Sequence, residues 1–350
     1  MSKGKTQDSS SDFQKSIEEL EARISELESV SKKTGIDLSE EVEKLRERSR
    51  QKKAEVFSKL TPWQRVQIAR DPNRPEVLDY IGTVFEDFVE LHGDRAYGDD
   101  KAIICGLCKV TEQQPTSVEH TSTGTERKSY KLMLIAHRKG KTTKERVACN
   151  FGSPHPEGYR KALEKMKFAE KFHLPIVTLV NTPGAYPGIG AEERGQANII
   201  AKNLFEMSKL RTPIISIVIG EGGSGGALAI CVADKLSILE NAYLSVISPE
   251  GCAAILWRDG SKAPLAAEAL KLTPQDLLKL GIVDEIIPEP LGGAHRDSIK
   301  MANTLKTYLL KYLEEVKSTN IDELLSRRYE KYRKMGVFVE SEQGSTMIKQ

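Results

Sequence analysis

The sequence is short of the features that mark membrane, nucleic-acid-binding and secreted proteins. Its apolar runs reach only about eight residues, too short to span a bilayer, so we expect no contact with a membrane. Basic and acidic residues nearly balance at a formal net charge of +2, which gives no argument for nucleic acid as a partner. The N-terminal residues carry no apolar segment typical of a secretory signal.

Cysteine is also scarce, with five residues in a chain of 350. This odd number favours a reducing compartment, and we therefore expect a cytoplasmic protein. Cys105 and Cys108 form a C-x-x-C pattern inside an apolar run over 102–110 that is typical of a strand. Residues three apart on a strand point to opposite faces, and no second pair for zinc follows. We expect structural thiols and no metal in this chain.

The hydropathy pattern divides the chain into four parts. Residues 1–12 are polar and expected to be disordered, and 13–60 are expected to form a helical hairpin. The apolar seam of its first helix is narrow, so the hairpin is predicted to contact another subunit. Residues 61–316 are expected to form the main domain, and 317–350 a C-terminal helix and tail. The seam consists of Phe13, Ile17, Leu20, Ile24 and Leu27.

The main domain begins with two strands around a polar insertion at 113–128, and helices then alternate with strands as in α/β folds. The expected helices cover 79–91, 157–172, 191–209, 227–233, 249–257, 273–280, 297–315 and 321–334. The expected strands cover 102–110, 130–137, 175–180, 214–219, 236–239, 243–247 and 282–287.

The glycine-rich turn over 220–226, Gly-Glu-Gly-Gly-Ser-Gly-Gly, is the most informative segment. It joins an apolar strand to a helix-forming run, where backbone N–H groups point outward and can hold a negatively charged oxygen. Tight packing of helix on strand would explain one or two of its glycines but not five. A phosphate loop is disfavoured because Ala227 follows Gly226 where that motif needs lysine.

A serine hydrolase is the main alternative for this turn. Ser224 lies in a G-x-S-x-G pattern between a strand and a helix, the setting of a nucleophile elbow. Asp284 and His295 follow in the chain order of an α/β-hydrolase triad. The third possibility is an oxyanion hole made of backbone amides alone, as enolate chemistry on thioesters requires.

Two further segments could take part in binding. The loop over 182–188 is stiffened by Pro183 and Pro187, and Tyr186 offers a flat face to a heterocyclic ligand, although a connecting loop is the simpler explanation. The segment over 137–146 is locally basic. It is either a solvated loop or a contact for the phosphate groups of a ligand.

Seven motifs together resemble the carboxyltransferase alpha subunit of bacterial-type acetyl-CoA carboxylase. They cover 91–97, 155–162, 181–188, 192–196, 220–230, 248–257 and 287–295. The resemblance implies a crotonase-like (ClpP/crotonase) α/β fold, with a core of βα superhelical units, an N-terminal helical hairpin and C-terminal helices. It also favours the oxyanion hole over the hydrolase, so that Ser224 would be a small turn residue.

The resemblance implies transfer of a carboxyl group from carboxybiotin to acetyl-CoA, which gives malonyl-CoA for fatty acid synthesis. Biotin would be carried by the biotin carboxyl carrier protein, and biotin carboxylase would be a further partner. A homologous beta subunit would hold acetyl-CoA and carry zinc. The expected assembly is an α2β2 hetero-oligomer, with the active site between the two kinds of subunit.

Site residues follow from the resemblance by motif. The amides of Gly225 and Gly226 would face the ureido oxygen of biotin. The residues that would shape this pocket are Gly222, Gly223, Gly184, Ala185 and Tyr186. The chain departs from the family at Asn181, where aspartate is usual, and at Cys105, where glycine is usual, and its insertion at 113–128 is longer than typical.

Overall fold

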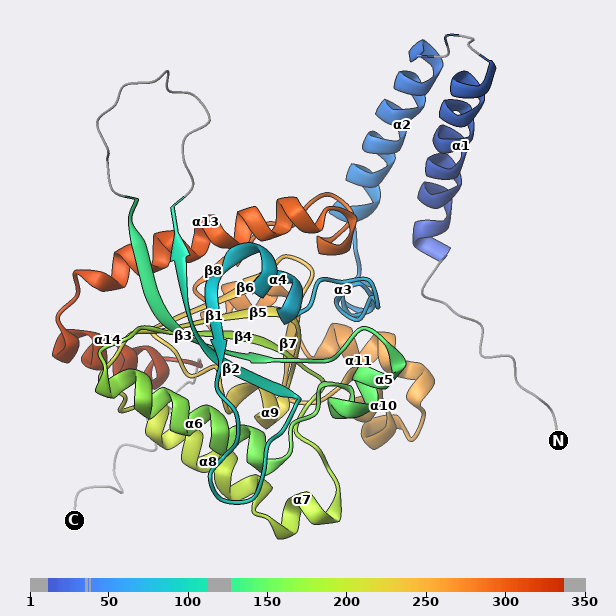
Figure 1. The fold of residues 1–350 in the computed structure, drawn as a ribbon. Coiled ribbons are helices and arrows are strands. Elements are labelled where there is room, and N and C mark those ends of the chain that lie inside the picture. The colour runs from blue at the N-terminus through green and yellow to red at the C-terminus, as the bar shows by residue number, and fades with distance from the viewer. Residues whose placement is uncertain (1–11, 35–36, 38, 113–126, 337–350) are drawn as a thin grey trace, which may run out of the picture.

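The computed structural model describes residues 12–34, 37, 39–112 and 127–336, and a mixed sheet of eight strands lies at its centre (Figure 1). Residues 1–11 of the expected tail at 1–12 and most of the insertion at 113–128 lie outside the described residues, and residue 12 already belongs to a helix. The strands are β1 (Glu86–Glu90), β2 (Ile103–Thr111), β3 (Ser129–His137), β4 (Ile176–Thr182), β5 (Ile214–Gly223), β6 (Lys235–Leu239), β7 (Tyr243–Ser245) and β8 (Glu285–Ile287).

The strand order is β1-β2-β3-β4-β5-β6-β8, and β7 pairs with the end of β5. The first three strands are antiparallel, and the pairs from β3 to β8 are parallel. Strands β4 and β5 are buried along their whole length, as their runs of branched apolar residues require. The carboxyl ends of β3, β4 and β5 therefore meet at one edge of the sheet.

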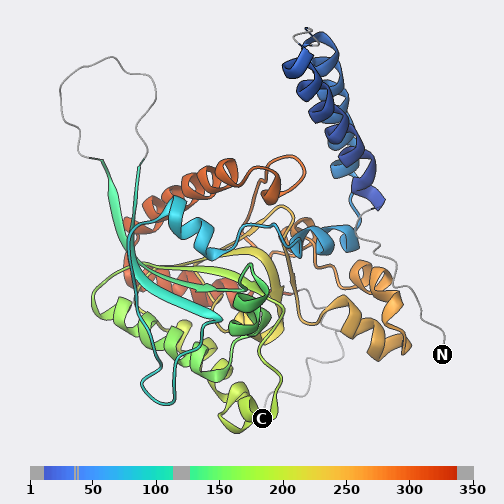
Figure 2. The same cartoon turned by 45° about the vertical axis from the view of Figure 1, so that its right-hand side comes forward.

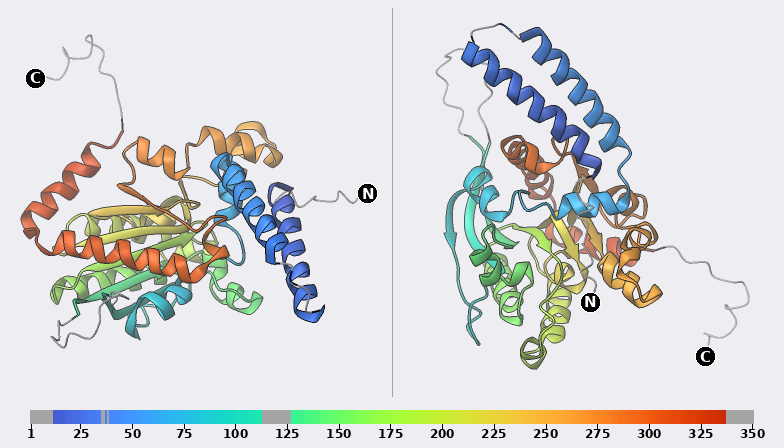
Figure 3. Two further views of the ribbon diagram at one scale, coloured as in Figure 1. Left: turned by 90° about the horizontal axis from the view of Figure 1, so that it is seen from above. Right: turned by 90° about the vertical axis from the view of Figure 1, so that its right-hand side faces the viewer.

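Helices cover both faces of the sheet (Figure 1). On one face lie α6 (Pro156–Lys171) and α8 (Gln196–Met207), and on the other lie α4 (Val77–Val84) and α13 (Ser298–Lys317). Seen from above in Figure 3, α13 crosses the sheet. Met166 of α6 and Leu305 of α13 belong to the same buried apolar cluster as the strands, so one core holds these layers together.

The remaining helices surround this core. They are α3 (Pro62–Ala69), α5 (Thr143–Ala148), α7 (Ile189–Glu193), α9 (Ser224–Leu228), α10 (Pro249–Trp257), α11 (Ala263–Ala269), α12 (Pro274–Lys279) and α14 (Ile321–Arg333), with short 3-10 turns at Asn150–Gly152, Gly260–Lys262 and Ala294–Arg296. Helix α14 is tied to the body by the buried Arg328, which donates to the carbonyls of Met207 and Leu210 at 2.8 and 2.9 Å.

The predicted helical hairpin is present as α1 (Asp12–Thr34) and α2 (Ser39–Ser58), and it projects from the body (Figures 1 and 2). Arg46 of α2 bonds Glu28 of α1 at 2.6 Å. Among the described side chains of α2, Val42 and Ser49 are buried. Contact of the hairpin with another subunit stays a prediction.

The helix expected over 79–91 is wrong in its second half. Helix α4 ends at Val84, and Glu86–Glu90 forms the edge strand β1. Its pairing with β2, from Glu86 opposite Lys109 to Glu90 opposite Gly106, supplies backbone hydrogen bonds that a helix pattern in the sequence does not reveal.

Two other expected helices also have different bounds. The helix expected over 191–209 is broken into α7 and α8 at Gly195, whose φ of +83° is left-handed. The helix expected over 227–233 is α9 at Ser224–Leu228, because β5 continues to Gly223 where it pairs with β7. The helix predicted over 249–257 is present with the same bounds as α10, and the other predicted helices and strands are present with shifted ends. None of the helices in the described part is long and apolar enough to cross a membrane.

Candidate functional site

The glycine turn after β5 lies against the loop after β4 at the carboxyl edge of the sheet. A Cβ atom on Gly223 would lie 2.1 Å from the carbonyl oxygen of Pro183, and one on Gly226 would lie 2.4 Å from the amide nitrogen of Ala185. On Gly222 it would lie 2.9 Å from the carbonyl oxygen of Tyr243. These glycines allow backbone to approach backbone.

This packing corrects the expectation that a structural turn explains only one or two of the five glycines. Gly222, Gly223 and Gly226 are required by close backbone contacts, and a Cβ atom on Gly220 would lie 2.6 Å from Oδ1 of Asn181. Gly225 is different, because its Cβ atom would make only ordinary contact with Ile200, at 3.5 Å. Gly225 is thus the glycine of the turn that close packing does not require.

The turn presents backbone donors where α9 begins. Ser224 has a left-handed φ of +51° and is exposed, and the helix starts at this residue. The first four N–H groups of any helix lack a partner within that helix, so the amides of Gly225 and Gly226 are among the donors available. The buried Tyr159 hydroxyl donates to the carbonyl oxygen of Gly226 at 3.2 Å, which fixes the peptide between Gly226 and Ala227.

The loop after β4 is held rigidly beside the turn. Thr182 accepts the N–H of Gly184 at 3.1 Å and donates to the carbonyl of Gly152 at 2.7 Å. Gly184 has a φ of +144°, which an L side chain rarely adopts. The half-buried ring of Tyr186 packs on His155, with ring centroids 4.1 Å apart. The structure therefore brings together all seven residues proposed for the site.

A buried carboxylate anchors the turn to other parts of the chain. Glu221 accepts bonds from Arg70 at 2.6 Å and from the Tyr243 hydroxyl at 2.7 Å, and it also pairs with Lys139. Burial alone would raise the pKa of Glu221, but the charges of Lys139 and Arg70 outweigh it and lower the pKa to about 2. The amide of Glu221 donates to Oδ1 of Asn181 at 3.0 Å.

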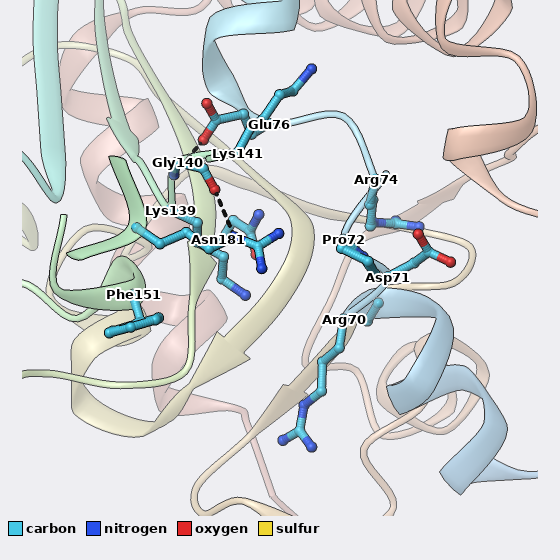
Figure 4. Close-up of a pocket in the computed structure, with 12 residues that line it drawn as sticks. Arg70, Asp71, Pro72, Arg74, Glu76, Lys139, Gly140, Lys141, Phe151 and Asn181 are labelled. Carbon is cyan, nitrogen blue, oxygen red and sulfur yellow. Dashed lines mark hydrogen bonds between the residues drawn. The ribbon is translucent and has the colours of Figure 1, made fainter. Parts of the chain in front are cut away.

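Next to this network lies a pocket with charged walls (Figure 4). Figure 4 shows Arg70, Asp71, Pro72 and Arg74 on one side and Lys139, Gly140 and Phe151 on the other. Ala69, Glu76, Lys141, Arg146 and Asn181 complete the lining. The pocket opens at the carboxyl edge, the usual place for ligands in α/β sheets.

One cation of this pocket wall, Arg74, already forms a buried ion pair. Arg74 pairs with the buried Glu289 at 2.5 Å and donates to the carbonyl of Ile219, the residue before the glycine turn, at 2.8 Å. The charge of Arg74 lowers the pKa of Glu289 although burial acts in the opposite direction. Through its bond to Ile219, this pair fixes the backbone where the glycine turn begins.

Sequence reasoning missed Arg70, Arg74 and Lys139 as parts of this site, although it noted the basic segment over 137–146. The one local signal was Glu221, a carboxylate directly after a fully apolar strand, which needs a positive partner when buried. Its partners lie far away in the chain, so the sequence alone does not identify them.

The structure separates the residues of the serine hydrolase alternative. Ser224 follows the carboxyl end of β5, whereas Asp284 precedes β8 and bonds the start of β6, its amide donating to the Leu236 carbonyl at 2.8 Å. Leu236 is in register with Ser216. The eight-residue step along β5 from Ser216 to Ser224 spans roughly 25 Å.

The other groups of that triad have different partners. The Asp284 carboxylate accepts from Lys331 at 2.5 Å and from the Leu236 amide at 2.6 Å. His295 is buried next to Asp71, with 3.7 Å between Nε2 and the carboxylate. The serine hydrolase alternative is therefore wrong.

Cys105 and Cys108 lie on β2 as buried free thiols. Burial raises the pKa of both thiols to about 12, which makes them poor nucleophiles and metal ligands. Within the described residues no group of three or more His, Cys, Asp or Glu side chains is placed to hold a metal ion.

Comparison with known proteins gives one consistent result. The family described as acetyl co-enzyme A carboxylase carboxyltransferase-like matches residues 10–336. The acetyl-coenzyme A carboxylase carboxyl transferase subunit alpha of Rhodopirellula baltica is 51% identical over 94% of this chain and 98% of its own length. The subunit of the same name from Methylococcus capsulatus is 53% identical over 94% of this chain and 97% of its own.

Solved structures support the fold. Transcarboxylase 12S matches with a TM-score of 0.50 and 22% identity over 68% of this chain and 42% of that one. The beta subunit of geranyl-CoA carboxylase from P. aeruginosa matches with a TM-score of 0.50 and 17% identity over 75% of this chain and 46% of that one. The predicted crotonase-like α/β fold is confirmed.

Proposed function

The chain belongs to the family of acetyl-CoA carboxylase carboxyltransferase alpha subunits, and from this premise we propose how its residues take part in carboxyl transfer. As a member of this family it is a carboxyltransferase subunit of a hetero-oligomeric, biotin-dependent enzyme that converts acetyl-CoA to malonyl-CoA. The proposal concerns the residues that receive the biotin group.

The carboxyl edge fits the ureido group of biotin, a small planar ring with a carbonyl oxygen. The turn over 220–226 offers neutral backbone donors, and the fixed loop beside it carries the ring of Tyr186. When bound, carboxylated biotin would supply a carboxyl group on a ring nitrogen; cleavage of this N–C bond would release CO2 and leave negative charge on the ureido oxygen.

Gly225 and Gly226 carry the proposed chemistry. Their amides stand at the start of α9, and both would donate to the ureido oxygen as it becomes negative. Preorganised donors of this kind lower the barrier because they need no rearrangement when the charge develops. The single observation behind the proposal is that Gly225 remains a glycine although close packing does not require one there.

The other site residues act by position. Gly222 and Gly223 let the turn approach β7 and the loop after β4, and Gly184 and Ala185 complete that contact. Tyr186 would lie against the flat face of the ring. Ser224 takes no chemical step and serves as the left-handed residue that begins α9.

The partners follow from the same premise. We expect a beta subunit that holds acetyl-CoA, a biotin carboxyl carrier protein that delivers the carboxyl group, and a biotin carboxylase that loads it. An α2β2 assembly of the two carboxyltransferase subunits, located in the cytoplasm, stays a prediction.

Replacing Gly225 by valine tests the oxyanion proposal. The new side chain would occupy the space in front of the amides, and we expect turnover of malonyl-CoA with biocytin by the assembled enzyme to fall roughly a hundredfold. The melting temperature should change little, because a Cβ atom on Gly225 would make only ordinary contact with Ile200. Gly226 is unsuitable for this test because any Cβ atom there meets backbone.

The control is Ser224→Gly, which removes the hydroxyl and suits the left-handed φ. Turnover of this variant should stay close to that of the unmodified enzyme. A fully active Gly225→Val enzyme, or an inactive Ser224→Gly enzyme, would contradict the assignment.

A further inference from the structure

Phe151 has an unusual backbone conformation at the rim of the charged pocket. Its φ and ψ are 54° and 27°, in the left-handed region, and it lies between Asn150 and Gly152, which are also left-handed. Asparagine and glycine tolerate this region, but it is a genuine outlier for a bulky aromatic residue. Such outliers cluster at functional sites, where the surrounding structure holds them in place.

Burial does not explain the aromatic side chain at this position. The ring of Phe151 is 60% exposed, so the fold gains little apolar contact from it. The backbone is nevertheless fixed directly after this residue: Gly152 donates to the carbonyl of Cys149 at 2.8 Å and accepts from Thr182 at 2.7 Å. The fold therefore holds a flat apolar ring at the pocket rim.

Arg146 lies five residues earlier, on α5, and lines the same pocket. Its Nε donates to the carbonyl of Gly140 at 3.3 Å, and the amide of Gly140 donates to the buried Glu76 at 2.9 Å, a contact visible in Figure 4. This arrangement orients the guanidinium. In the described part of the chain, no ion pair or hydrogen bond occupies its two terminal amino groups.

The other cations of the pocket are engaged. Arg70 and Lys139 share Glu221, Arg74 holds Glu289, and Lys141 pairs with Asp79 at 2.5 Å. Among the described pocket residues, Arg146 is the cation that pairs with no carboxylate, so its charge is left for a ligand. A guanidinium with two amino groups available matches a carboxylate through two parallel hydrogen bonds.

We propose that Arg146 and Phe151 form a clamp in the carboxyl-transfer site. Arg146 binds the carboxylate that is being transferred, and the ring of Phe151 lies against the flat apolar side of the group that carries it. This inference rests on the proposed function and assigns two positioning residues for it. Asn181 links the pocket to the glycine turn, because it lines the pocket and its side chain accepts a hydrogen bond from the amide of Glu221.

The carboxylate can be presented by the carboxylated biotin ring or by the malonyl thioester, and kinetics of the assembled enzyme distinguish the two. The reaction of malonyl-CoA with biocytin is followed for Arg146→Gln, Arg146→Lys and the control Lys144→Gln, an exposed charge on the same helix. We expect kcat/KM to fall roughly ten- to hundredfold in Arg146→Gln. Arg146→Lys should recover only part of it, and Lys144→Gln should match the unmodified enzyme.

Whether the loss in Arg146→Gln appears in KM or in kcat identifies which molecule presents the carboxylate. A raised KM for malonyl-CoA with an unchanged KM for biocytin indicates the thioester carboxylate. A lowered kcat with both KM values unchanged indicates the carboxylate on the biotin ring. Unchanged kinetics of Arg146→Gln would overturn the proposal.

Phe151→Gly gives a readout besides activity. Glycine suits the left-handed φ, and the exposed ring packs little, so the melting temperature should stay the same or rise. The KM for biocytin should rise about tenfold through loss of the aromatic contact, and calorimetric titration with biocytin should show the same weakening. A lowered melting temperature with unchanged biocytin binding would assign Phe151 a structural role and overturn the clamp.

These experiments separate the clamp from the proposed function. If the unmodified assembled enzyme does not turn over malonyl-CoA with biocytin, the proposed function fails. If it does, and the Arg146 and Phe151 variants behave like it, only the clamp fails.

Discussion

His137, at the carboxyl end of β3, is a buried residue with a charge state that depends on folding. Burial, together with the neighbouring charge of Lys139, lowers the pKa of His137 to about 3 from its ordinary value of 6.5. The folded protein therefore keeps this imidazole neutral over a pH range in which the unfolded chain binds a proton.

This difference predicts a loss of stability in mild acid. Below pH 6.5 and down to about 3, His137 should lower the free energy of unfolding by about 1.4 kcal/mol per pH unit, because only the unfolded state takes up the proton. Urea unfolding between pH 7 and 5 measures this slope. In His137→Phe, which cannot titrate, the slope should be smaller by about that amount.

His173→Asn is the matched control. This exposed histidine has a left-handed φ of 54°, which asparagine tolerates, so its replacement should leave the slope unchanged. Equal slopes for His137→Phe and the unmodified chain would contradict the prediction.

The sequence predicted the glycine turn as a binding site. It did not show why most positions of the turn must be glycine. Gly223 and Gly226 meet Pro183 and Ala185, about forty positions earlier in the sequence, and only the folded chain shows that contact. Arg70 reaches Glu221 across 151 positions. Short motifs report local geometry, whereas partners of buried charges depend on topology.

Among the elements, the hairpin of α1 and α2 is the least integrated. It projects from the body in Figures 1 and 2, and few described side chains of α2 are buried. The next helix, α3, has its own N-terminal cap, in which Thr61 accepts the amide of Gln64 at 3.2 Å. The body can therefore begin at this cap without the hairpin.

A chain that starts at Leu60 tests the role of the hairpin. We expect it to fold with a melting temperature within a few degrees of the full chain, because the main core lies outside the hairpin. Association with the beta subunit, measured by light scattering after mixing, should be weakened. Undiminished association would contradict a subunit-contact role, and failure to fold would make the hairpin part of the core.

Element types were predictable where the pattern was strong, and element ends were not. Strands β4 and β5 are continuous apolar runs, and the ends predicted from the sequence differ from the observed ones by at most two residues for β4 and four for β5. Strand β1 was missed because an edge strand with one paired neighbour carries a weak periodic signal. The break at Gly195 depends on a left-handed φ that a lone glycine in a helical pattern does not require.

On the scale of the whole molecule, the resemblance of long motifs predicted the fold correctly where composition and periodicity gave only an α/β class. The strand–turn–helix junction that carries the proposed backbone donors lies at the end of β5. Carboxyl transfer to a thioester places negative charge on two oxygens, that of the ureido group and that of the thioester enolate. Each needs its own donors.

This requirement predicts that the chain is inactive without its partner. Purified alone, it should not convert malonyl-CoA and biocytin to acetyl-CoA, because the donors for the thioester oxygen would lie on the beta subunit. Addition of that subunit should restore turnover in proportion to complex formed, and light scattering should give two copies of each chain. The Gly225→Val variant should bind the beta subunit equally well but stay inactive. This result would show that complex formation alone does not give turnover. Turnover by the chain alone would place both sets of donors on this polypeptide and refute the divided site.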